Sequence, residues 1–428
     1  MSVAIAGIYQ ERITAKIPFR SAHVATPNPA YRPELDALRF FAFLCVFNLH
    51  RLDYALTDPV RDLWSYRIGV IGAFGVPVFF MLSAFLITDL LLRERDRTGN
   101  VHVGSFYMRR ILRIWPLYFA SFFGLAMLNH FVPGVGTNNR LAYLEFTLFA
   151  GNWYIVRHGW IAAPVAGLWS ISVEEQFYIV IPLLASLGGR RALRWVCYLL
   201  LVASYITIWR YALYSPEQNR QWTNSFFDFQ YFCVGTLLAI LLRGRAPKLL
   251  IPVRLFGFAL AFACWLVALI RFHVKSYAPH ATVGEACVGW LLVLIGTLLF
   301  FVCTLGMPSK FVPQWLIYLG RISYGLYIFH PLVYFMVFNK IGPLWSHRFH
   351  SLQVPDRFSD LRIAAGIVFA FALNIALAHL SYRYFERPFL RLKQRFSFVT
   401  SRRDTDDRLD LLNLKIRVRS PFFSSFLS

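Results

Sequence analysis

The chain alternates between long apolar segments and short polar ones over most of its length. Many of the apolar segments are close to the roughly 20 residues that an α-helix needs to cross a bilayer. They include residues 68–92, 114–132, 167–187, 225–242, 283–304 and 362–385, and a shorter segment at 37–50 that its flanking residues can extend. We therefore expect an all-α polytopic membrane protein, with about ten transmembrane helices around an internal cavity.

The apolar segment at residues 141–155 is too short to span a bilayer. If it crossed, the basic residues 188–194 would lie outside. If it stays on the outer side, these residues and the later basic loops all fall inside, as the positive-inside bias favours. We expect a short re-entrant or interfacial element here.

The composition supports a membrane protein and sets the expected partners. Hydrophobic residues make up 57% of the chain and charged residues only 15%, against about 25% in soluble domains. The net charge of +22 comes from basic residues at the ends of apolar segments, so it indicates contact with membrane lipid and no nucleic-acid partner.

The same bias predicts three regions. Residues 1–35 form a cytoplasmic N-terminal segment, residues 36–390 the membrane domain, and residues 391–428 a basic cytoplasmic C-terminal tail. The six cysteines lie in or beside apolar segments without paired spacing, so we expect neither a disulfide framework nor a metal.

The first apolar helix carries a polar stripe. Eleven helical steps separate Arg39 from His50, so the two side chains share one face and lie about 16 Å apart along the axis. Asp36 falls near the same face. A neutral imidazole can accept a hydroxyl proton, and intramembrane ionisable groups usually serve a function. Alternatively, His50 is a structural hydrogen-bonding group between helices.

Two adjacent carboxylates open the span at residues 167–187. They belong to Trp169-Ser-Ile-Ser-Val-Glu-Glu-Gln-Phe-Tyr178, in which Ser170, Glu174 and Tyr178 share a face. Glu174 and Glu175 at the mouth of an apolar helix need partners, either a substrate or a neighbouring helix.

A basic pair begins the span that precedes the short element. Arg110 and Arg113 are three residues apart and share a helical face. Guanidinium groups match phosphate oxygens, whether these belong to a ligand or to lipid headgroups.

A fourth polar stretch is Gly320-Arg-Ile-Ser-Tyr-Gly-Leu-Tyr-Ile-Phe-His330-Pro. Ser323, Tyr327 and His330 share one face, with Tyr324 beside it. Such density of polar groups in a span indicates a cavity wall; close packing of helices is the alternative.

Together these stretches resemble the acyltransferase-3 family of integral membrane O-acyltransferases. The resemblance rests on Arg39-x10-His50, on Phe-Phe-Met-Leu-Ser-Ala-Phe-Leu-Ile, on Arg110-x-x-Arg113, on the two motifs quoted above and on Glu386-Arg-Pro388, all in the family's order. Ala37, Phe40 and Ala84 stand where the family often has glycine. Many members carry a further C-terminal hydrolase-like domain, and we expect the stand-alone form here.

The resemblance implies transfer of an acyl group, usually acetyl from acetyl-CoA, to a hydroxyl of a glycan or glycolipid in a bacterial inner membrane. His50 is then the general base, with Asp36, Glu174 or Glu175 helping to orient the site or balance its charge. Arg39, Arg110 and Arg113 would bind the CoA phosphates, without a metal. Glu175, Ser323, Tyr324 and His330 would line the substrate cavity. Direct transfer and an acyl-enzyme relay both remain open, as does the oligomeric state.

The runner-up function is a membrane transporter of a glycolipid or a proton-coupled solute, with the polar stripe as its pathway. Transport would need no CoA, and this difference separates the two hypotheses.

Overall fold

The computed structural model describes residues 31–55, 63–214, 221–274, 282–342 and 359–396. The described residues contain helices and no strand. Most of the expected terminal segments 1–35 and 391–428 lies outside the described residues, so their cytoplasmic placement stays a prediction.

The helices follow the apolar pattern closely. In chain order they are α1 (Pro33–His50), α2 (Leu52–Ala55), α3 (Leu63–Ile71), η1 (Gly72–Phe74), α4 (Gly75–Thr98), α5 (Val103–Leu128), α6 (Arg140–Thr147), α7 (Gly151–His158), η2 (Pro164–Leu168), α8 (Trp169–Leu187), α9 (Gly189–Tyr214), α11 (Ser225–Leu242), α12 (Ile251–Ile270), α13 (Val283–Thr304), η3 (Ser309–Phe311), α14 (Gln314–Arg321), α15 (Ser323–Phe335), η4 (Met336–Ile341), α17 (Ser359–Leu380), η6 (Ser381–Glu386), α18 (Arg387–Lys393) and η7 (Gln394–Phe396).

Eight of the described helical segments are long and apolar enough to span a membrane. A ninth candidate is the bent pair of α14 with α15 and η4, whose two parts meet at 68°. The remaining expected span is α1, which has 18 residues and carries Glu34, Asp36 and Arg39 in its first two turns. The all-α polytopic membrane fold is therefore confirmed.

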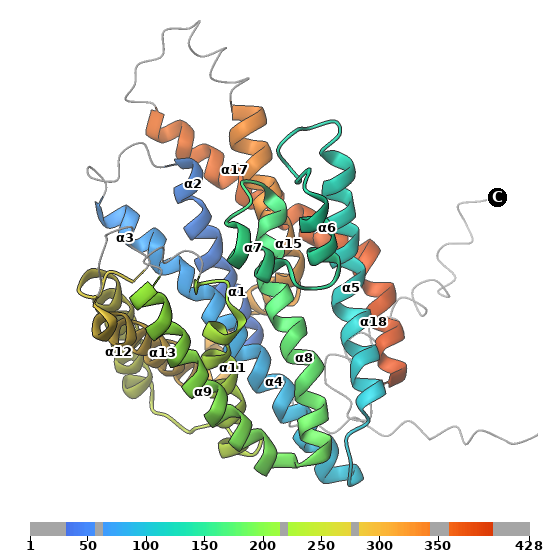
Figure 1. Cartoon of the computed structure of the whole chain (residues 1–428), viewed down its shortest axis with the longest axis vertical. Helices are drawn as coiled ribbons and strands as arrows, with labels where there is room; N and C mark the ends of the chain where they lie inside the picture. Colours follow the sequence, from blue (N-terminus) through green and yellow to red (C-terminus); the bar gives the residue numbers. More distant parts are fainter. Residues whose placement is uncertain (1–30, 56–62, 215–220, 275–281, 343–358, 397–428) are drawn as a thin grey trace, which may run out of the picture. The chain divides into compact units, whose positions relative to one another are not determined.

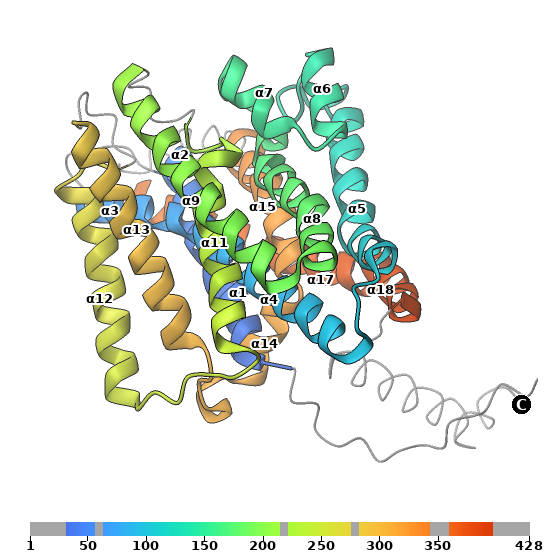
Figure 2. The same ribbon diagram turned by 60° about the horizontal axis from the view of Figure 1, so that its bottom comes forward.

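The segment at 141–155 forms two short helices, α6 and α7, of eight residues each. At 1.5 Å per residue each is about 12 Å long, far less than a bilayer's apolar thickness. Figures 1 and 2 show the pair at one end of the bundle, beside the N-terminal end of α8. Neither helix can cross a membrane.

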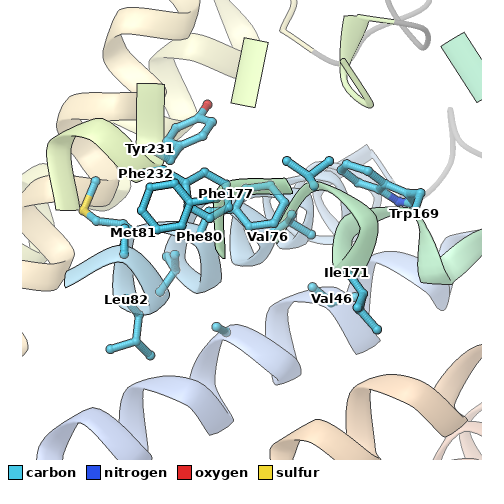
Figure 3. Close-up of a cluster of buried hydrophobic side chains, with 14 of the residues drawn as sticks. Val46, Val76, Phe80, Met81, Leu82, Trp169, Ile171, Phe177, Tyr231 and Phe232 are labelled. Carbon is cyan, nitrogen blue, oxygen red and sulfur yellow. The ribbon is translucent and has the colours of Figure 1, made fainter. Parts of the chain in front are cut away.

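Aromatic side chains fill the space between α4, α8 and α11. Phe232 stacks on Phe80 and packs tilted against Phe177, with ring centroids 4.6 Å apart in each pair. Figure 3 shows these three rings together, near Met81 and Tyr231. Helix association in lipid depends on close packing more than on water exclusion, so interlocked rings of this kind stabilise the bundle.

Two glycines let α1 lie close to its neighbours. A Cβ on Gly320 of α14 would lie 1.9 Å from the carbonyl oxygen of Asp36, and one on Gly72 of η1 would lie 2.1 Å from that of Cys45. Any side chain at these positions would push α1 away. Glycine therefore fixes the position of both halves of α1.

Candidate functional site

Helix α5 presents its arginines in two directions. The buried carboxylate of Glu94 on α4 accepts hydrogen bonds from the His102 backbone N–H at 2.9 Å and from Arg109 at 3.0 Å. Arg109 is thereby committed to fixing the start of α5. Arg110 and Arg113, on the other side, line an internal cavity.

This cavity, which we call the arginine pocket, has a volume of about 100 Å³ and lies between α1, α4, α5, α8 and α15. Its polar lining consists of Arg39, Ser83, Arg110, Arg113, Ser170, Glu174, Tyr178, Ser323, Tyr324 and Tyr327, and its apolar lining of Val76, Phe79, Phe80, Leu82, Ile114 and Ile171. Pockets for drug-sized ligands measure about 300–1,000 Å³. The arginine pocket is therefore of a size for a short acyl group.

Hydroxyl groups link the walls of the arginine pocket. Tyr178 lies 2.5 Å from the Ser83 hydroxyl and donates to Glu174 at 3.2 Å, and the Arg110 guanidinium lies 5.6 Å from the Tyr178 ring centroid. On the other side, the hydroxyls of Ser170 and Tyr327 are 2.6 Å apart. These contacts join α4, α5, α8 and α15 around one small volume.

The two adjacent glutamates point to different surroundings. Glu174 lines the arginine pocket, close enough to Arg110 and Arg113 for electrostatic attraction. Glu175 does not line it: one carboxylate oxygen accepts from the Trp115 indole N–H at 3.1 Å, and the other is buried without a hydrogen-bond partner in the part of the chain that is described. Glu174, expected beside His50, therefore lines the arginine pocket, whereas Glu175, expected in the cavity wall, does not.

Asp36 belongs to the Arg39 end of α1. Its carboxylate accepts from Arg39 at 2.6 Å, and only 3% of the residue is exposed. Fourteen residues of helix put it about 21 Å along the axis from His50. The geometry therefore assigns Asp36 to holding Arg39, in place of the expected role beside His50.

A pair of histidines lies beyond the arginine pocket. The rings of His50 and His330 are 5.0 Å apart between centroids, and the Tyr327 ring is 5.4 Å from that of His330. Neither histidine lines the pocket itself. Tyr327, which lines the pocket one helical turn before His330, connects the two sites.

The acidic partner of His50 is Asp53, at 2.9 Å from its Nδ1. Because a carboxylate accepts, the Nδ1–H donates, and the Nε2 lone pair of the neutral ring is left for another proton. Asp53 was not among the predicted site residues because it follows the apolar segment in a stretch of mixed charge. Its i, i+3 spacing from His50 was the available signal, since α2 continues the helical path.

The remaining predicted site residues divide between pocket and packing. Ser323 and Tyr324 line the arginine pocket, and the Tyr324 hydroxyl also donates to the Ile114 carbonyl at 2.8 Å.

Among the described residues, no three His, Cys, Asp or Glu side chains gather as metal ligands would.

Several known proteins are similar to this chain. A protein of Staphylococcus aureus strain MSSA476, provisionally named an O-acetyltransferase, is 26% identical over 84% of the chain and 57% of its own length. A Bacillus subtilis protein, provisionally named the peptidoglycan O-acetyltransferase YrhL, is 28% identical over 85% of the chain and 55% of its own. The O-acetyltransferase OatA of S. aureus strain MRSA252 is 24% identical over 90% and 62%.

The chain thus spans little more than half the length of these relatives. No solved structure matches it significantly. A family model described as an acyltransferase domain matches residues 32–383, which hold the arginine pocket, both histidines and Asp53. The chain belongs to the acyltransferase-3 family of integral membrane proteins.

Proposed function

We propose that this chain transfers an acetyl group from cytoplasmic acetyl-CoA to a hydroxyl of a glycan or glycolipid at a bacterial inner membrane. The observation that carries the proposal is the arginine pocket, in which three arginines gather beside a carboxylate and several hydroxyls, as a site for the phosphates of an acyl donor requires. The printed names of the relatives, one of which specifies peptidoglycan, support acetyl as the group and a glycan as the acceptor.

The donor side is the Arg39 end of α1. Arg39, Arg110 and Arg113 offer guanidinium groups, which pair with phosphate oxygens, and Asp36 holds the first of them in place. The positive-inside bias of the basic loops supports a cytoplasmic position for this end, where CoA is available, and for both chain termini. Glu174 limits the mutual repulsion of the arginines.

The acceptor side is the His50 end. His50 is 33% exposed at its side chain, so an acceptor can reach it, and Asp53 holds its ring with Nε2 ready to accept a proton. As the acceptor hydroxyl attacks the acetyl carbon, His50 takes its proton. Removal of that proton makes the oxygen a competent nucleophile.

The test is transfer of label from [¹⁴C-acetyl]-CoA to glycan in membranes that contain the chain. We expect transfer with the wild type and almost none with His50→Ala. Transport of a glycolipid without consumption of acetyl-CoA would instead favour the transporter. Undiminished transfer by His50→Ala would remove His50 from the reaction while leaving the acetyltransferase intact.

A further inference from the structure

Resting on the proposed function, the geometry points to His330 as a second catalytic histidine that carries the acetyl group. The His330 ring packs against Tyr327, which lines the arginine pocket, and against His50. We infer that the thioester in the pocket acetylates His330 first, and that the acceptor hydroxyl then takes the acetyl group from His330 while His50 removes its proton.

The order of the groups in space supports this relay. From the pocket, the Tyr327 ring lies 5.4 Å from His330, and His330 lies 5.0 Å from His50. His50 reaches away from the pocket to Asp53. An acyl group that leaves the pocket on the Tyr327 side therefore meets His330 before it meets His50.

The hydrogen bonds of His330 prepare its outer nitrogen for attack. Its Nδ1 lies 2.5 Å from the Tyr327 carbonyl oxygen, which can only accept, so the proton is on Nδ1. Nε2 then carries the lone pair. It is buried and, among the described residues, has no hydrogen-bond partner. A neutral imidazole with Nδ1–H bonded and Nε2 free is the form that acts as a nucleophile.

His50 and His330 would therefore have different tasks although they are neighbours. Each Nδ1–H has its own acceptor, so both Nε2 atoms are basic and neither donates to the other. His50 is partly exposed and has a carboxylate to stabilise a positive ring, which suits proton uptake. His330 is 1% exposed, which protects an acyl-imidazole from water.

The steps balance. The Nε2 lone pair of His330 forms a bond to the thioester carbonyl carbon, the C–S bond breaks, and CoA leaves as a thiolate that takes a proton from water. The acetyl-imidazolium keeps its Nδ1–H on the Tyr327 carbonyl. The acceptor oxygen then bonds to the acetyl carbon as His50 Nε2 takes the hydroxyl proton, and the N–C bond breaks to regenerate neutral His330.

The Ser170–Tyr327 hydrogen bond at 2.6 Å stands between the pocket and His330. The Phe79 ring packs against Tyr327 at 5.7 Å, edge to face. Tyr327 must turn aside for the acetyl group to reach His330. Entry of the donor into the pocket would displace it.

Isotope exchange tests the relay without an acceptor. The purified full chain is mixed with acetyl-CoA and radiolabelled CoA, and label appearing in acetyl-CoA reports reversible formation of an acetyl-enzyme. We expect exchange in the wild type, and a loss of about 100-fold or more in His330→Ala and His330→Gln. His50→Ala should keep the exchange but fail to acetylate the acceptor.

The matched control is His379→Gln. His379 is a histidine of α17 whose Nδ1 lies 2.5 Å from the Tyr318 hydroxyl, outside the arginine pocket and the histidine pair. It should leave both exchange and transfer within about twofold of the wild type. Monodispersity in detergent shows whether each variant folds.

Top-down mass spectrometry of the folded wild type, introduced from detergent at neutral pH so that an acyl-imidazole stays buried, tests the relay even if both His330 variants misfold. Acetyl on His330 supports the relay; acetyl on His50 or Tyr327, or on no residue, overturns it. Acceptor acetylation without any exchange in the wild type also overturns the relay while leaving the proposed function intact. If the wild type neither acetylates an acceptor nor exchanges CoA, the proposed function itself is wrong.

Discussion

Arg39 and His50 lie on one helix, yet α1 holds them in opposite ways. At the Arg39 end, Asp36 is almost fully buried and the α14 backbone lies against it at Gly320. At the His50 end, the partner Asp53 is 61% exposed at its side chain. A cation fixed by a buried carboxylate suits the precise holding of a donor's phosphate, whereas a partly exposed imidazole suits an acceptor that arrives from solvent.

The largest loss of activity should follow from substitution of His50. We expect His50→Ala to lower kcat for acetyl transfer by about 10²–10⁴-fold, because general base catalysis contributes that much. Binding of acetyl-CoA, measured by calorimetry in detergent, should change by less than about twofold, since His50 does not line the arginine pocket.

A fall in kcat with unchanged acetyl-CoA binding is expected only if the two ends of α1 serve different substrates. If His50→Ala weakened acetyl-CoA binding as strongly as it slowed transfer, the two ends of α1 would form a single site. The clean division between donor and acceptor sides would then be wrong.

The second largest change in kinetics should follow from substitution of the arginines in the arginine pocket. Arg110→Gln and Arg113→Gln each remove a charge-assisted contact to phosphate, which contributes about 1.5–3 kcal/mol. We expect KM for acetyl-CoA to rise about 10–100-fold in steady-state assays, with a smaller change in kcat.

The control for charge alone is Arg194→Gln, at an exposed position of α9 outside the pocket. It should leave KM within about twofold of the wild type. A similar rise in KM for Arg194→Gln would show that the arginines act through the general surface charge rather than through the pocket.

The fold could be predicted from the sequence because apolar length determines what can span a bilayer. The short helices α6 and α7 show this most clearly, since their segment was identified by being too short. Helix α1 shows the limit: its charged first turns reduce its hydropathy, and only packing against α14 and η1 explains how it sits in the bundle.

For the site, the sequence predicts only which residues of one helix share a face. Shared faces correctly grouped Ser170, Glu174 and Tyr178, which line one pocket. They could not separate Glu174 from Glu175, because Glu175 bonds to Trp115 of another helix and Glu174 does not. The pairing of His50 with His330 joins residues 280 positions apart and leaves no mark in local spacing.

A smaller effect should come from the buried pair at the Arg39 end. Asp36→Asn keeps an oxygen that can accept from Arg39 but removes the charge, so Arg39 is held less firmly. We expect KM for acetyl-CoA to rise about tenfold with kcat nearly unchanged. A fall in kcat at constant KM would instead connect Asp36 with His50, as the sequence analysis expected.

The smallest effect should come from Asp53→Asn, and it tests the exposed end directly. Exposed ion pairs contribute about 0.2–1 kcal/mol, which corresponds to a fall in kcat of about 1.4- to fivefold, with KM for acetyl-CoA unchanged. Asp53 acts through the His50 ring, so the double variant with His50→Ala should be no slower than His50→Ala alone. A further loss in the double variant would mean that Asp53 contacts the acceptor itself, and the His50 end would then bind its substrate as firmly as the Arg39 end binds the donor.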